Sequence, residues 1–505
     1  MLLAAIQRHA AERPDAIAIR HPPPFDEFGR FTWRMLAEDV SAILDHIAGD
    51  PELGNQAPIG WFQHNCADAI TTLIACAEAG RPHVPLNWRL TEDELRFIEA
   101  DCGMAAILTD EHSGWDGHPG PWNPYAILHP YLHAAIYGET QAVIGFTGPV
   151  TLSFQHGGII AAHASHPPET PLLIAYTSGT TGRPKGVTLT QGQVAANIAH
   201  AQALFGFTPE DRVLAVLPLF HLGGLCIQTL PGLLAGAEII LHARFEPDAV
   251  FDSLERDKPT LTLLVPAVMA ALVRHPRWAE ADISCLRAIG AGSSDVPLHL
   301  IAAFHAKGVP VQQVYGMTEA GPIAIAQSVS EAWAHAGSLG FPVGGCAARI
   351  GVADEIQLRG PNIFAGYWGD DAATEAAHTA DGWFRTGDAG RMDGDGRFWF
   401  TGRLTHIIIS GGENIAPAEV ERVLLTAPGV REGVVIGRPD LRWGEVPVAV
   451  IVADATCDDG AVLRHFEGRL ARFKHPRAVL RVAALPRTAL GKVQLDTVRA
   501  LTAGG

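Results

Sequence analysis

Apolar and polar positions alternate along the chain with two periods, which predicts strands interleaved with helices. Short apolar runs typical of buried strands occur at Leu172–Tyr176, Val213–Leu217, Glu238–Leu241 and Leu261–Val265. Helix-length segments separate these runs, and that spacing is typical of parallel βαβ units. The first 140 residues alternate in the same way and begin with an amphipathic helix. The pattern therefore predicts an α/β fold.

One helix start is specified by its own residues. Thr91 is followed three positions later by Glu94, and this pair forms a capping box that satisfies the first amides of a helix. We therefore expect a helix from residue 92. Residues 112–133 are instead rich in His, Pro, Gly and Trp without any period. We interpret them as an irregular surface connection, with a His-rich metal site as the alternative.

A change of pattern near residue 402 predicts a domain boundary. Before it, Asp393–Gly396 has the composition of a hairpin turn and precedes a strand at Phe398–Phe400. After it, a βαβ-like alternation returns, with strands at Gly433–Gly437 and Val448–Val452. The expected parts are a large N-terminal domain over residues 1–402, a hinge over 403–406 and a small C-terminal α+β domain over 407–505.

Composition and charge exclude several classes of protein. The chain has 505 residues, and 37 Lys and Arg against 54 Asp and Glu give a net charge of −17. This balance argues against a broad nucleic-acid-binding face, which needs clustered cations. The longest apolar stretch, Thr260–Val273, is interrupted by Pro266 and falls short of the roughly 20 residues of a transmembrane span. Seven scattered cysteines and a short apolar N-terminus without a preceding basic residue predict a cytoplasmic protein with reduced thiols.

The most informative segment is Tyr176–Gly186, which reads YTSGTTGRPKG and follows a predicted buried strand. Its three glycines allow backbone amides to approach an anion closely. Its four hydroxyls can donate to phosphate oxygens, and Lys185 adds positive charge. The segment therefore predicts a phosphate-binding loop, against the alternative of a flexible polar loop. It is not the P-loop of kinases and GTPases, because its lysine stands in another register.

The loop closely resembles the signature loop of the adenylate-forming superfamily, which includes acyl- and aryl-CoA synthetases, peptide-synthetase adenylation domains and firefly luciferase. Further segments resemble the family's motifs in the same order: Pro218–Gly224 (PLFHLGG), Val314–Glu319 (VYGMTE), Asp381–Asp388 (DGWFRTGD), Gly402–Arg403, Ser410–Ile415 (SGGENI) and Pro486–Lys492 (PRTALGK). The resemblance covers essentially the whole chain. It implies a large N-terminal domain of αβαβα subdomains with a β-barrel-like subdomain, and a small mobile C-terminal domain.

The resemblance assigns residues to ATP and to Mg²⁺. Thr177 and Glu319 match the metal contacts, and a carboxylate with a hydroxyl is a suitable donor set for this ion. Lys492 matches a lysine that crosses the domain interface to the α-phosphate and the substrate carboxylate. The expected catalytic residues are Lys492, Glu319, Thr318, Lys185 and His221. The expected ATP and AMP contacts are Thr177, Ser178, Gly179, Thr180, Thr181, Gly182, Lys185, Gly292, Ser293, Tyr315, Gly316, Met317, Thr318, Asp388, Arg403 and Lys492.

Within this set, particular roles are implied. Asp388 matches the contact to the ribose hydroxyls, Arg403 a second ribose or phosphate contact, and Tyr315 the residue that stacks on adenine. The chain also departs from the family. Asp295 replaces the usual Pro beside the adenine loop, and Gln191 replaces a His that follows the phosphate loop. The hinge position is a neutral Thr405, to which we assign no electrostatic role.

The second half-reaction needs a thiol, which in relatives of this length is usually coenzyme A. The residues that match CoA contacts are Gly411, Gly412, Trp443, Phe473 and Arg477. An aromatic ring can stack on adenine and a cation can bind the 3′-phosphate. The alternative for Trp443 and Phe473 is a place in the core of the small domain.

The acyl pocket implied by the resemblance is lined by His221, Gly223, Ala267, Ala270 and Ile289. The segments that border it contain no Arg or Lys, so a second carboxylate would be buried without a partner. We therefore expect a monocarboxylic, mostly apolar acid, fatty or aryl. The sequence AGSLG at residues 336–340 resembles fatty-acyl-CoA ligases and slightly favours a fatty acid.

The sequence thus predicts an acid–CoA ligase that forms an acyl-adenylate from ATP, releases pyrophosphate and transfers the acyl group to CoA. One alternative is a stand-alone ligase that loads the phosphopantetheine of a carrier protein. The other is a non-catalytic adenylate-binding relative, against which Lys492, Glu319 and the intact loop weigh. The identity of the acid and the existence of a homo-oligomer stay open.

Overall fold

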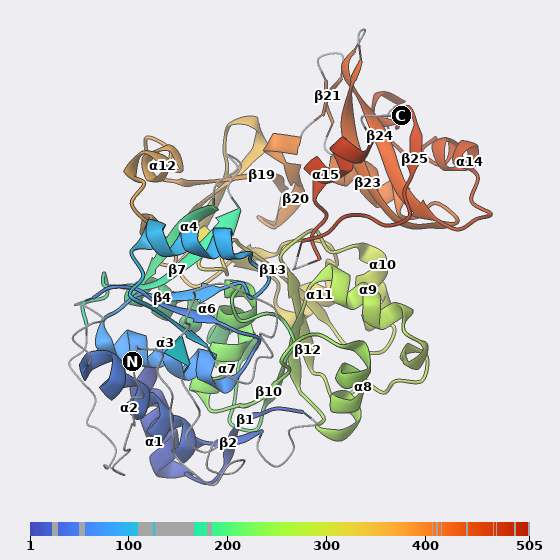
Figure 1. Cartoon of the computed structure of the whole chain (residues 1–505). Coiled ribbons are helices and arrows are strands. Elements are labelled where there is room, and N and C mark those ends of the chain that lie inside the picture. The colour runs from blue at the N-terminus through green and yellow to red at the C-terminus, as the bar shows by residue number, and fades with distance from the viewer. Residues whose placement is uncertain are drawn as a thin grey trace.

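The computed structural model describes residues 1–22, 29–49, 56–109, 125–126, 166–178, 184–406, 408–410, 413–415, 417–440, 443–467, 469–470, 472–488 and 491–502. The chain forms a large N-terminal body and a smaller C-terminal lobe that meets it near β20 (Figure 1). The region 112–133, interpreted above as a surface connection, lies outside the described residues except for β6 (Tyr125–Ala126). No helix in the described ranges is long and apolar enough to cross a bilayer.

The first sheet has nine strands in the order β15-β14-β13-β12-β11-β9-β10-β1-β2. Its bounds are β1 (Ile17–Arg20), β2 (Arg30–Thr32), β9 (Arg212–Ala215), β10 (Glu238–Leu241), β11 (Leu261–Leu264), β12 (Ala288–Gly292), β13 (Val311–Tyr315), β14 (Ile325–Ala326) and β15 (Phe341–Pro342). The strands β9 to β13 pair in parallel, which confirms the predicted βαβ units. Crossovers between parallel strands supply α7 (Leu230–Ala235), α8 (Pro247–Arg256), α9 (Pro266–Arg274) and α10 (Leu298–His305).

The second sheet has seven strands in the order β18-β8-β7-β4-β3-β5-β6. Its other bounds are β3 (Ile59–Phe62), β4 (His83–Leu86), β5 (Ala106–Thr109), β7 (Pro171–Ser178), β8 (Pro184–Thr190) and β18 (Gly366–Tyr367). The helices in the first part of the chain are α1 (Leu2–Glu12), α2 (Trp33–Gly49), α3 (Ala67–Ala79), α4 (Glu92–Cys102) and α6 (Gln191–Phe205). The capping box that starts α4 is confirmed, because Thr91 and Glu94 exchange both hydrogen bonds. The predicted N-terminal amphipathic helix is α1, which buries Leu3 and Ile6.

Helix α6 contacts β7 and β8 of the second sheet, and it also contacts α7, which packs on β10 of the first. The two sheets are therefore joined through a middle helical layer. Their apolar side chains form one continuous core that includes Trp33, Phe205 and Ile289. A four-stranded antiparallel sheet completes the N-terminal body: β16 (Ala347–Ile350), β17 (Glu355–Arg359), β19 (Phe384–Met392) and β20 (Phe398–Arg403). The hairpin turn predicted at residues 393–396 joins β19 to β20.

The C-terminal lobe has its own sheet, in the order β22-β21-β24-β23 with β25 beside β24. The elements are β21 (Ile408–Ser410), β22 (Glu413–Ile415), α13 (Pro417–Leu424), β23 (Val430–Asp440), β24 (Gly444–Ala453), α14 (Asp459–Arg464), β25 (Val479–Arg481) and α15 (Leu495–Thr502). The predicted boundary lies between β20 and β21, and the hinge segment begins as the last residue of β20 and continues as a short 3₁₀ turn, Leu404–His406.

One part of the expectation for this lobe is wrong. The strands predicted at 433–437 and 448–452 form an antiparallel hairpin, not a βαβ unit. The parallel βαβ unit is β24-α14-β25. Both faces of the hairpin are buried, with Val434 and Val450 in one cluster and Val435 and Ile451 in another. Because neither face is polar, the alternation along each strand carries no information about its partner.

Candidate active site

Strands β7 and β8 hold the two ends of the predicted phosphate loop. Thr177 and Lys185 are direct partners in the antiparallel register, and Ser178 pairs with Pro184. Gly179, Thr180, Thr181 and Gly182 lie outside the described residues, as does the Ser178 side chain. The register places Thr177 and Lys185 opposite each other, close to where the loop begins and ends.

Lys185 and Glu319 meet at a residue that sequence reasoning missed, Tyr367. The Lys185 Nζ atom lies 4.9 Å from the centroid of the Tyr367 ring. The Tyr367 hydroxyl donates a 3.0 Å hydrogen bond to Glu319 Oε1. Burial and the negative charge of Glu319 raise the pKa of Tyr367, so the hydroxyl keeps its proton and acts as a donor. A cation and a carboxylate are thus held on one aromatic side chain.

Nothing in the local sequence pointed to Tyr367. It lies in the two-residue strand β18, where Gly366 pairs with Thr188 and Tyr367 pairs with Val187 of β8. The following residue, Trp368, donates its amide to Gly186 O at 2.7 Å. This edge pairing carries Tyr367 to the end of the phosphate loop, and only the tertiary structure specifies it.

Asp388 is the centre of a second polar cluster. It is the register partner of Arg403 across β19 and β20, and Arg403 Nε lies 2.7 Å from Asp388 Oδ1. This contact is ionic rather than an aligned hydrogen bond, because Asp388 Oδ1 has no hydrogen-bond donor among the described residues. The Tyr315 hydroxyl donates a 2.9 Å hydrogen bond to Asp388 Oδ2. Three residues predicted to contact the nucleotide are therefore brought together.

Burial dominates the electrostatics of Asp388. Its side chain is almost fully buried, and burial raises its pKa although Arg403 and the Tyr315 hydroxyl oppose the shift. Its backbone amide donates to Thr386 Oγ1 at 3.0 Å, which fixes the strand locally. A desolvated carboxylate with one oxygen lacking a donor can accept hydrogen bonds from hydroxyl groups.

Lys492 of the C-terminal lobe lies within electrostatic range of Asp388 and Arg403 in this second cluster. It lies in a turn closed by hydrogen bonds from Thr488 N to Lys492 O, at 2.7 Å, and from Gly491 N to Thr488 O, at 2.8 Å. The turn packs against α9 so closely that a Cβ atom on Gly491 would lie 2.4 Å from the Cβ of Ala267. Although the residue is more than a third exposed, burial of its ammonium and repulsion from Arg403 lower the pKa of Lys492, and Asp388 opposes the shift.

Two glycines of the predicted nucleotide contacts are required by close backbone approaches. A Cβ atom on Gly292 would lie 2.3 Å from Val314 O, and one on Gly316 would lie 2.0 Å from Pro322 O. Ser293 has a φ of 72°, so the chain turns sharply where β12 ends. Met317 directly precedes the 3₁₀ turn Thr318–Ala320, which carries Glu319. These constraints bring the ends of β12 and β13 to one edge of the first sheet, where ligands of open α/β sheets commonly bind.

Asp295, which replaces the family's Pro, is half-buried and interacts electrostatically with the C-terminal lobe. Burial raises its pKa, and Arg422 of α13 opposes the shift. The other departure, Gln191, has a structural role: its amide donates to Ala77 O at 2.9 Å. The preceding Thr190 forms a capping box with Gln193 and thereby starts α6. Gln191, which stands in place of the family's histidine, is therefore the first residue of α6.

The predicted acyl-pocket residues differ in accessibility. Gly223 is open, because a Cβ atom there would meet only Ile227 Cδ1, at 3.9 Å, among the described atoms. Ala267 and Ala270 are half-buried on α9, whereas Ile289 of β12 is fully buried in the core. Burial first, and then Arg89, lower the pKa of His221 to about 4, so its imidazole is neutral at pH 7.

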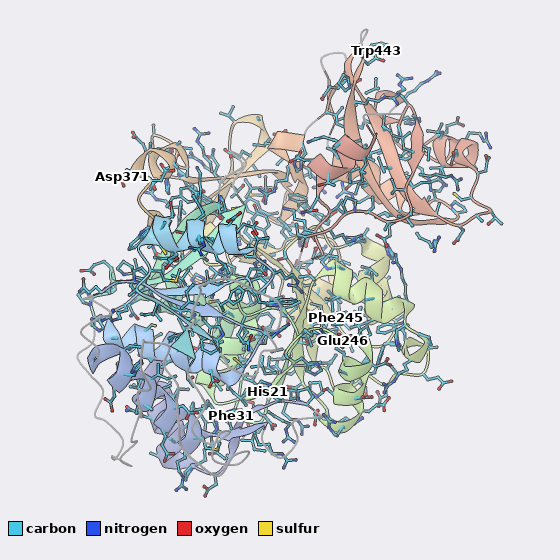
Figure 2. All side chains as sticks on the ribbon, in the orientation of Figure 1. His21, Phe31, Phe245, Glu246, Asp371 and Trp443 are labelled. Atoms are coloured by element: carbon cyan, nitrogen blue, oxygen red, sulfur yellow. The ribbon has the colours of Figure 1, made fainter. Side chains whose placement is uncertain are left out.

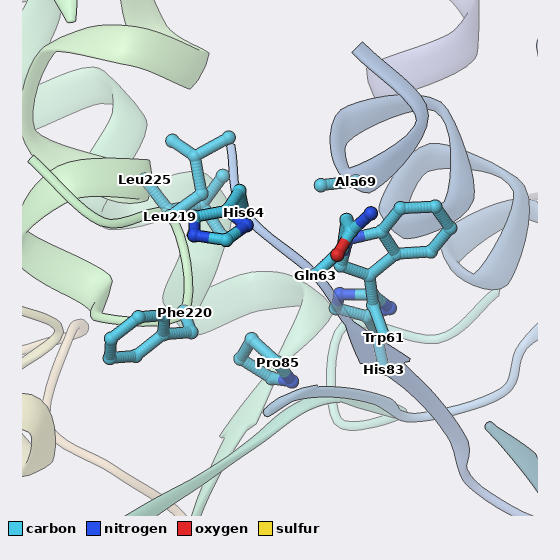
Figure 3. Close-up of a pocket in the computed structure, with 9 residues that line it drawn as sticks. All are labelled: Trp61, Gln63, His64, Ala69, His83, Pro85, Leu219, Phe220 and Leu225. Atoms are coloured by element: carbon cyan, nitrogen blue, oxygen red, sulfur yellow. The ribbon is translucent and has the colours of Figure 1, made fainter. Parts of the chain in front are cut away.

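The influence of Arg89 corrects the view that no cation lies near this pocket. The bordering segments contain no Arg or Lys, but Arg89 comes from the turn before α4, and its guanidinium stacks 3.9 Å from the centre of the Trp88 ring. A small cavity lies beside the same region, lined by Trp61, Gln63, His64, Ala69, His83, Pro85, Leu219, Phe220 and Leu225 (Figure 3). Within the described structure, the buried atoms Trp61 Nε1 and His83 Nδ1 have no hydrogen-bond partner.

Of the predicted CoA residues, the structure describes the side chains of Trp443 and Arg477. Trp443 lies at the tip of the β23–β24 hairpin, at the end of the C-terminal lobe farthest from the N-terminal body (Figure 2). It is 39% exposed, so the alternative that it forms part of the small-domain core is wrong. Arg477 is exposed and its amide donates to Pro447 O at 2.8 Å. Gly411, Gly412 and the Phe473 side chain lie outside the described structure.

Comparison with known proteins gives consistent matches over the whole length. Residues 6–368 match the model of the AMP-binding enzyme family, and residues 419–492 match the AMP-binding enzyme C-terminal domain. The chain is 40% identical over 515 aligned positions to an indoleacetate–CoA ligase of Aromatoleum aromaticum, covering 99% of this chain and 97% of the relative. It is 35% identical to a feruloyl-CoA synthase of Amycolatopsis sp, covering 97% of each.

A solved structure is similar in fold. The o-succinylbenzoate coenzyme A synthetase of Bacillus subtilis, in complex with ATP and magnesium ion, superposes with a TM-score of 0.81 at 29% identity, covering 98% of this chain and 99% of that one. The observed sheets, the polar clusters around Glu319 and Asp388, and the family matches agree with one another. The chain therefore belongs to the AMP-binding enzyme family, the adenylate-forming superfamily that its motifs resemble.

Proposed function

We propose that the chain is an AMP-forming acid–CoA ligase that activates an aryl-substituted carboxylic acid. The observation that carries this proposal is the position of Lys492. A lysine from the C-terminal lobe lies in the field of Asp388 and Arg403 of the N-terminal body. A carboxylate and an ATP phosphate are both anions, so a reaction between them requires a cation close to the reacting atoms. Lys492 of the C-terminal lobe can supply that cation.

In the first half-reaction, the two polar clusters bind different parts of ATP. Asp388 accepts hydrogen bonds from the ribose hydroxyls, with Tyr315 and Arg403 holding its carboxylate in place. Lys185 neutralises phosphate oxygens at the loop between β7 and β8. Lys492 stabilises the charge that develops as the substrate carboxylate attacks the α-phosphate and pyrophosphate leaves.

Magnesium suits the oxygen donors of Glu319, in the first polar cluster with Lys185 and Tyr367, and of Thr177. The Glu319 carboxylate and the Thr177 hydroxyl are hard oxygen ligands, and no group of three or more His, Cys, Asp or Glu residues gathers in the described structure. Mg²⁺ is usually bound by one or two protein oxygens together with phosphates and waters, so this sparse set suits it. Bound there, the ion would neutralise phosphate charge. The Tyr367 hydroxyl orients Glu319 for this role.

The preference for an aryl acid revises the weak sequence preference for a fatty acid. That preference came from residues 336–340, but Ser338 is fully buried and its hydroxyl accepts a 2.7 Å hydrogen bond from Gln327. A Cβ atom on Gly340 would lie 2.2 Å from Ala326 O. These residues pack the sheet edge and carry no information about the acid. The relatives named for indoleacetate and ferulate support an aryl acid instead.

His221 is suited to the apolar side of such a substrate. Its ring lies 4.4 Å from the ring of Phe220, and its lowered pKa keeps it neutral. A neutral imidazole beside a phenyl ring presents a largely apolar, aromatic surface, against which another aromatic ring packs well. CoA as the acceptor and a cytoplasmic location are parts of the same proposal, supported by the CoA ligases among the relatives and by the scattered cysteines.

The test measures pyrophosphate release from ATP and Mg²⁺ with a panel of acids: indoleacetate, ferulate, phenylacetate, benzoate, octanoate and palmitate. Each acid is assayed without acceptor, with CoA and with a phosphopantetheinylated carrier protein. We expect turnover with aryl acids and CoA. Turnover only with the carrier protein would establish the carrier-loading alternative, and no release with any acid would contradict an enzymatic function.

A further inference from the structure

Both ends of α9, the helix that carries Ala267 and Ala270, touch the C-terminal lobe, which lies directly beyond it (Figure 1). At the first end, Ala267 packs against Gly491. At the other end, Arg274 Nη1 donates a 3.0 Å hydrogen bond to Glu432 Oε1 of β23. Arg274 Nη2 also donates to the carbonyl oxygen of Arg431, at 2.9 Å. One helix of the N-terminal body is thus fixed to the lobe at two points.

Glu432 connects this contact to the turn that carries Lys492. Its second carboxylate oxygen accepts a hydrogen bond from Arg487 Nη2. Arg487 Nη1 in turn donates a 2.6 Å hydrogen bond to the carbonyl oxygen of Gly491, the residue before Lys492. Burial raises the pKa of Glu432, but the hydrogen bonds from Arg487 and Arg274 outweigh it and lower the pKa. The carboxylate is therefore charged and binds both guanidinium groups.

We propose that Arg274 is a positioning residue for acid activation, which holds the C-terminal lobe where Lys492 meets the reacting groups and acts through Glu432 and Arg487. This inference rests on the proposed function, because it takes the closed arrangement as the one that forms the acyl-adenylate. Arg274 touches neither nucleotide nor acid in this scheme. It fixes the lobe, and Arg487 fixes the carbonyl next to Lys492.

The strength of the contact suits a lobe that must also move. The side chain of Arg274 is 52% exposed and that of Glu432 is 25% exposed, and ion pairs this open to solvent are weak and sensitive to salt. The contact can therefore bias the lobe toward the closed arrangement without preventing its release for thioester formation. We expect removal of Arg274 to slow adenylation about fivefold, equivalent to ~1 kcal/mol.

The experiment separates the two half-reactions in the full-length protein. ATP–pyrophosphate exchange is measured with indoleacetate, and thioester formation is measured from supplied indoleacetyl-adenylate and CoA. Arg274→Ala should lower kcat for exchange about fivefold, leave the KM for ATP unchanged and leave thioester formation unchanged. The loss should shrink at high ionic strength, and Arg274→Lys should restore most of the rate. Equal slowing of both half-reactions would overturn the proposal.

A matched control is available on the same surface. Arg277 lies three residues beyond Arg274, and it pairs with Asp252 and Glu255 of its own domain. Arg277→Ala removes the same charge without touching the lobe, so it should leave both half-reactions unchanged. A loss in exchange equal to that of Arg274→Ala would show that the effect is general destabilisation and would overturn the proposal.

A double variant tests whether Arg274 acts through Lys492. In a Lys492→Ala background, Arg274→Ala should have no further effect on the residual exchange rate, because the group that it positions is absent. A further fivefold loss would overturn the proposal. If the unmodified protein exchanges pyrophosphate and Arg274→Ala exchanges it at the same rate, this inference alone is contradicted. Unmodified protein that exchanges with no acid would contradict the proposed function.

Discussion

The Tyr367 hydroxyl donates a 3.0 Å hydrogen bond to Glu319 Oε1 while its ring lies under the Lys185 ammonium. The three residues come from β8, from the 3₁₀ turn after β13 and from β18. One tyrosine therefore contacts both the proposed phosphate-binding cation and the proposed Mg²⁺ ligand. We therefore expect Tyr367 to influence the dependence of adenylation on Mg²⁺.

Replacing Tyr367 by Phe keeps the ring under Lys185 and removes only the hydrogen bond to Glu319. Hydrogen bonds to charged groups are worth about 1.5–3 kcal/mol, so we expect the Mg²⁺ concentration for half-maximal adenylation to rise at least about tenfold. The measurement is pyrophosphate release against Mg²⁺ concentration. Tyr176→Phe is the matched control, because the Tyr176 hydroxyl binds Asp101 on α4 instead. An unchanged Mg²⁺ dependence in Tyr367→Phe would show that Glu319 is oriented by other groups.

Lys492→Ala should slow ATP–pyrophosphate exchange about 10²–10³-fold and leave thioester formation from supplied acyl-adenylate largely intact. The physical reason is that the ammonium stabilises charge only in the adenylation step, a loss on the order of 2.7–4 kcal/mol for one transition-state donor. Single-turnover measurements of each half-reaction give the comparison. Equal losses in both would mean that one arrangement of the lobes serves both steps.

A side chain at Gly223 should narrow the proposed acyl pocket without disturbing the fold. Gly223 has φ −58° and ψ −50°, which any residue adopts, and open space where a side chain would lie. Gly223→Val should therefore fold normally and exclude part of the acid, with about 0.8 kcal/mol lost for each excluded methylene. The expected result is a loss of kcat/KM that grows with the size of the acid, at constant KM for ATP.

Gly223 is a better position for this test than Ala267. A bulky residue at Ala267 would collide with Gly491 of the C-terminal lobe, and it would therefore block closure as well as the pocket. Ala267→Trp should lower adenylation of all acids alike, whereas Gly223→Val should discriminate among them. A uniform loss in Gly223→Val would place the acid elsewhere.

Stability should depend on pH through Glu421 of α13. Burial first, and then the charge of Asp295, raise the pKa of Glu421 to about 7, although the amide of Val435 opposes the shift. A carboxyl with a raised pKa binds its proton more tightly in the folded state. Its contribution to stability is thus complete below its ordinary pKa and is lost between about pH 4.5 and pH 7, at up to ~1.4 kcal/mol per pH unit.

Denaturant unfolding at pH 5 and pH 8 measures this contribution. Glu421→Gln should be more stable than the unmodified chain at pH 8, and the fall in stability between the two pH values should be smaller. Glu467→Gln is the control, because Glu467 is exposed and makes the same change of charge. An identical pH dependence in Glu421→Gln and the unmodified chain would contradict the assignment.

Much of the local structure could be predicted from the sequence. The strands at residues 172, 213, 238 and 261, the capping box at Thr91 and the hairpin turn at 393–396 depend on neighbours within a few residues, and the structure has all of them. The order of the motifs also predicted the family. The pairing of the C-terminal strands could not be predicted, because strands buried on both faces do not reveal which partner they choose.

The site shows the same division between local and tertiary information. The sequence alone determined which residues carry charge and hydroxyl groups, and where the glycines stand. The tertiary structure alone decided that Asp388 lies opposite Arg403, that Tyr367 joins Lys185 to Glu319, and that Arg274 reaches Glu432. These contacts depend on strand register and on the seating of the C-terminal lobe. The strand register and the position of the lobe are set by burial summed over many residues, which no single sequence motif reveals.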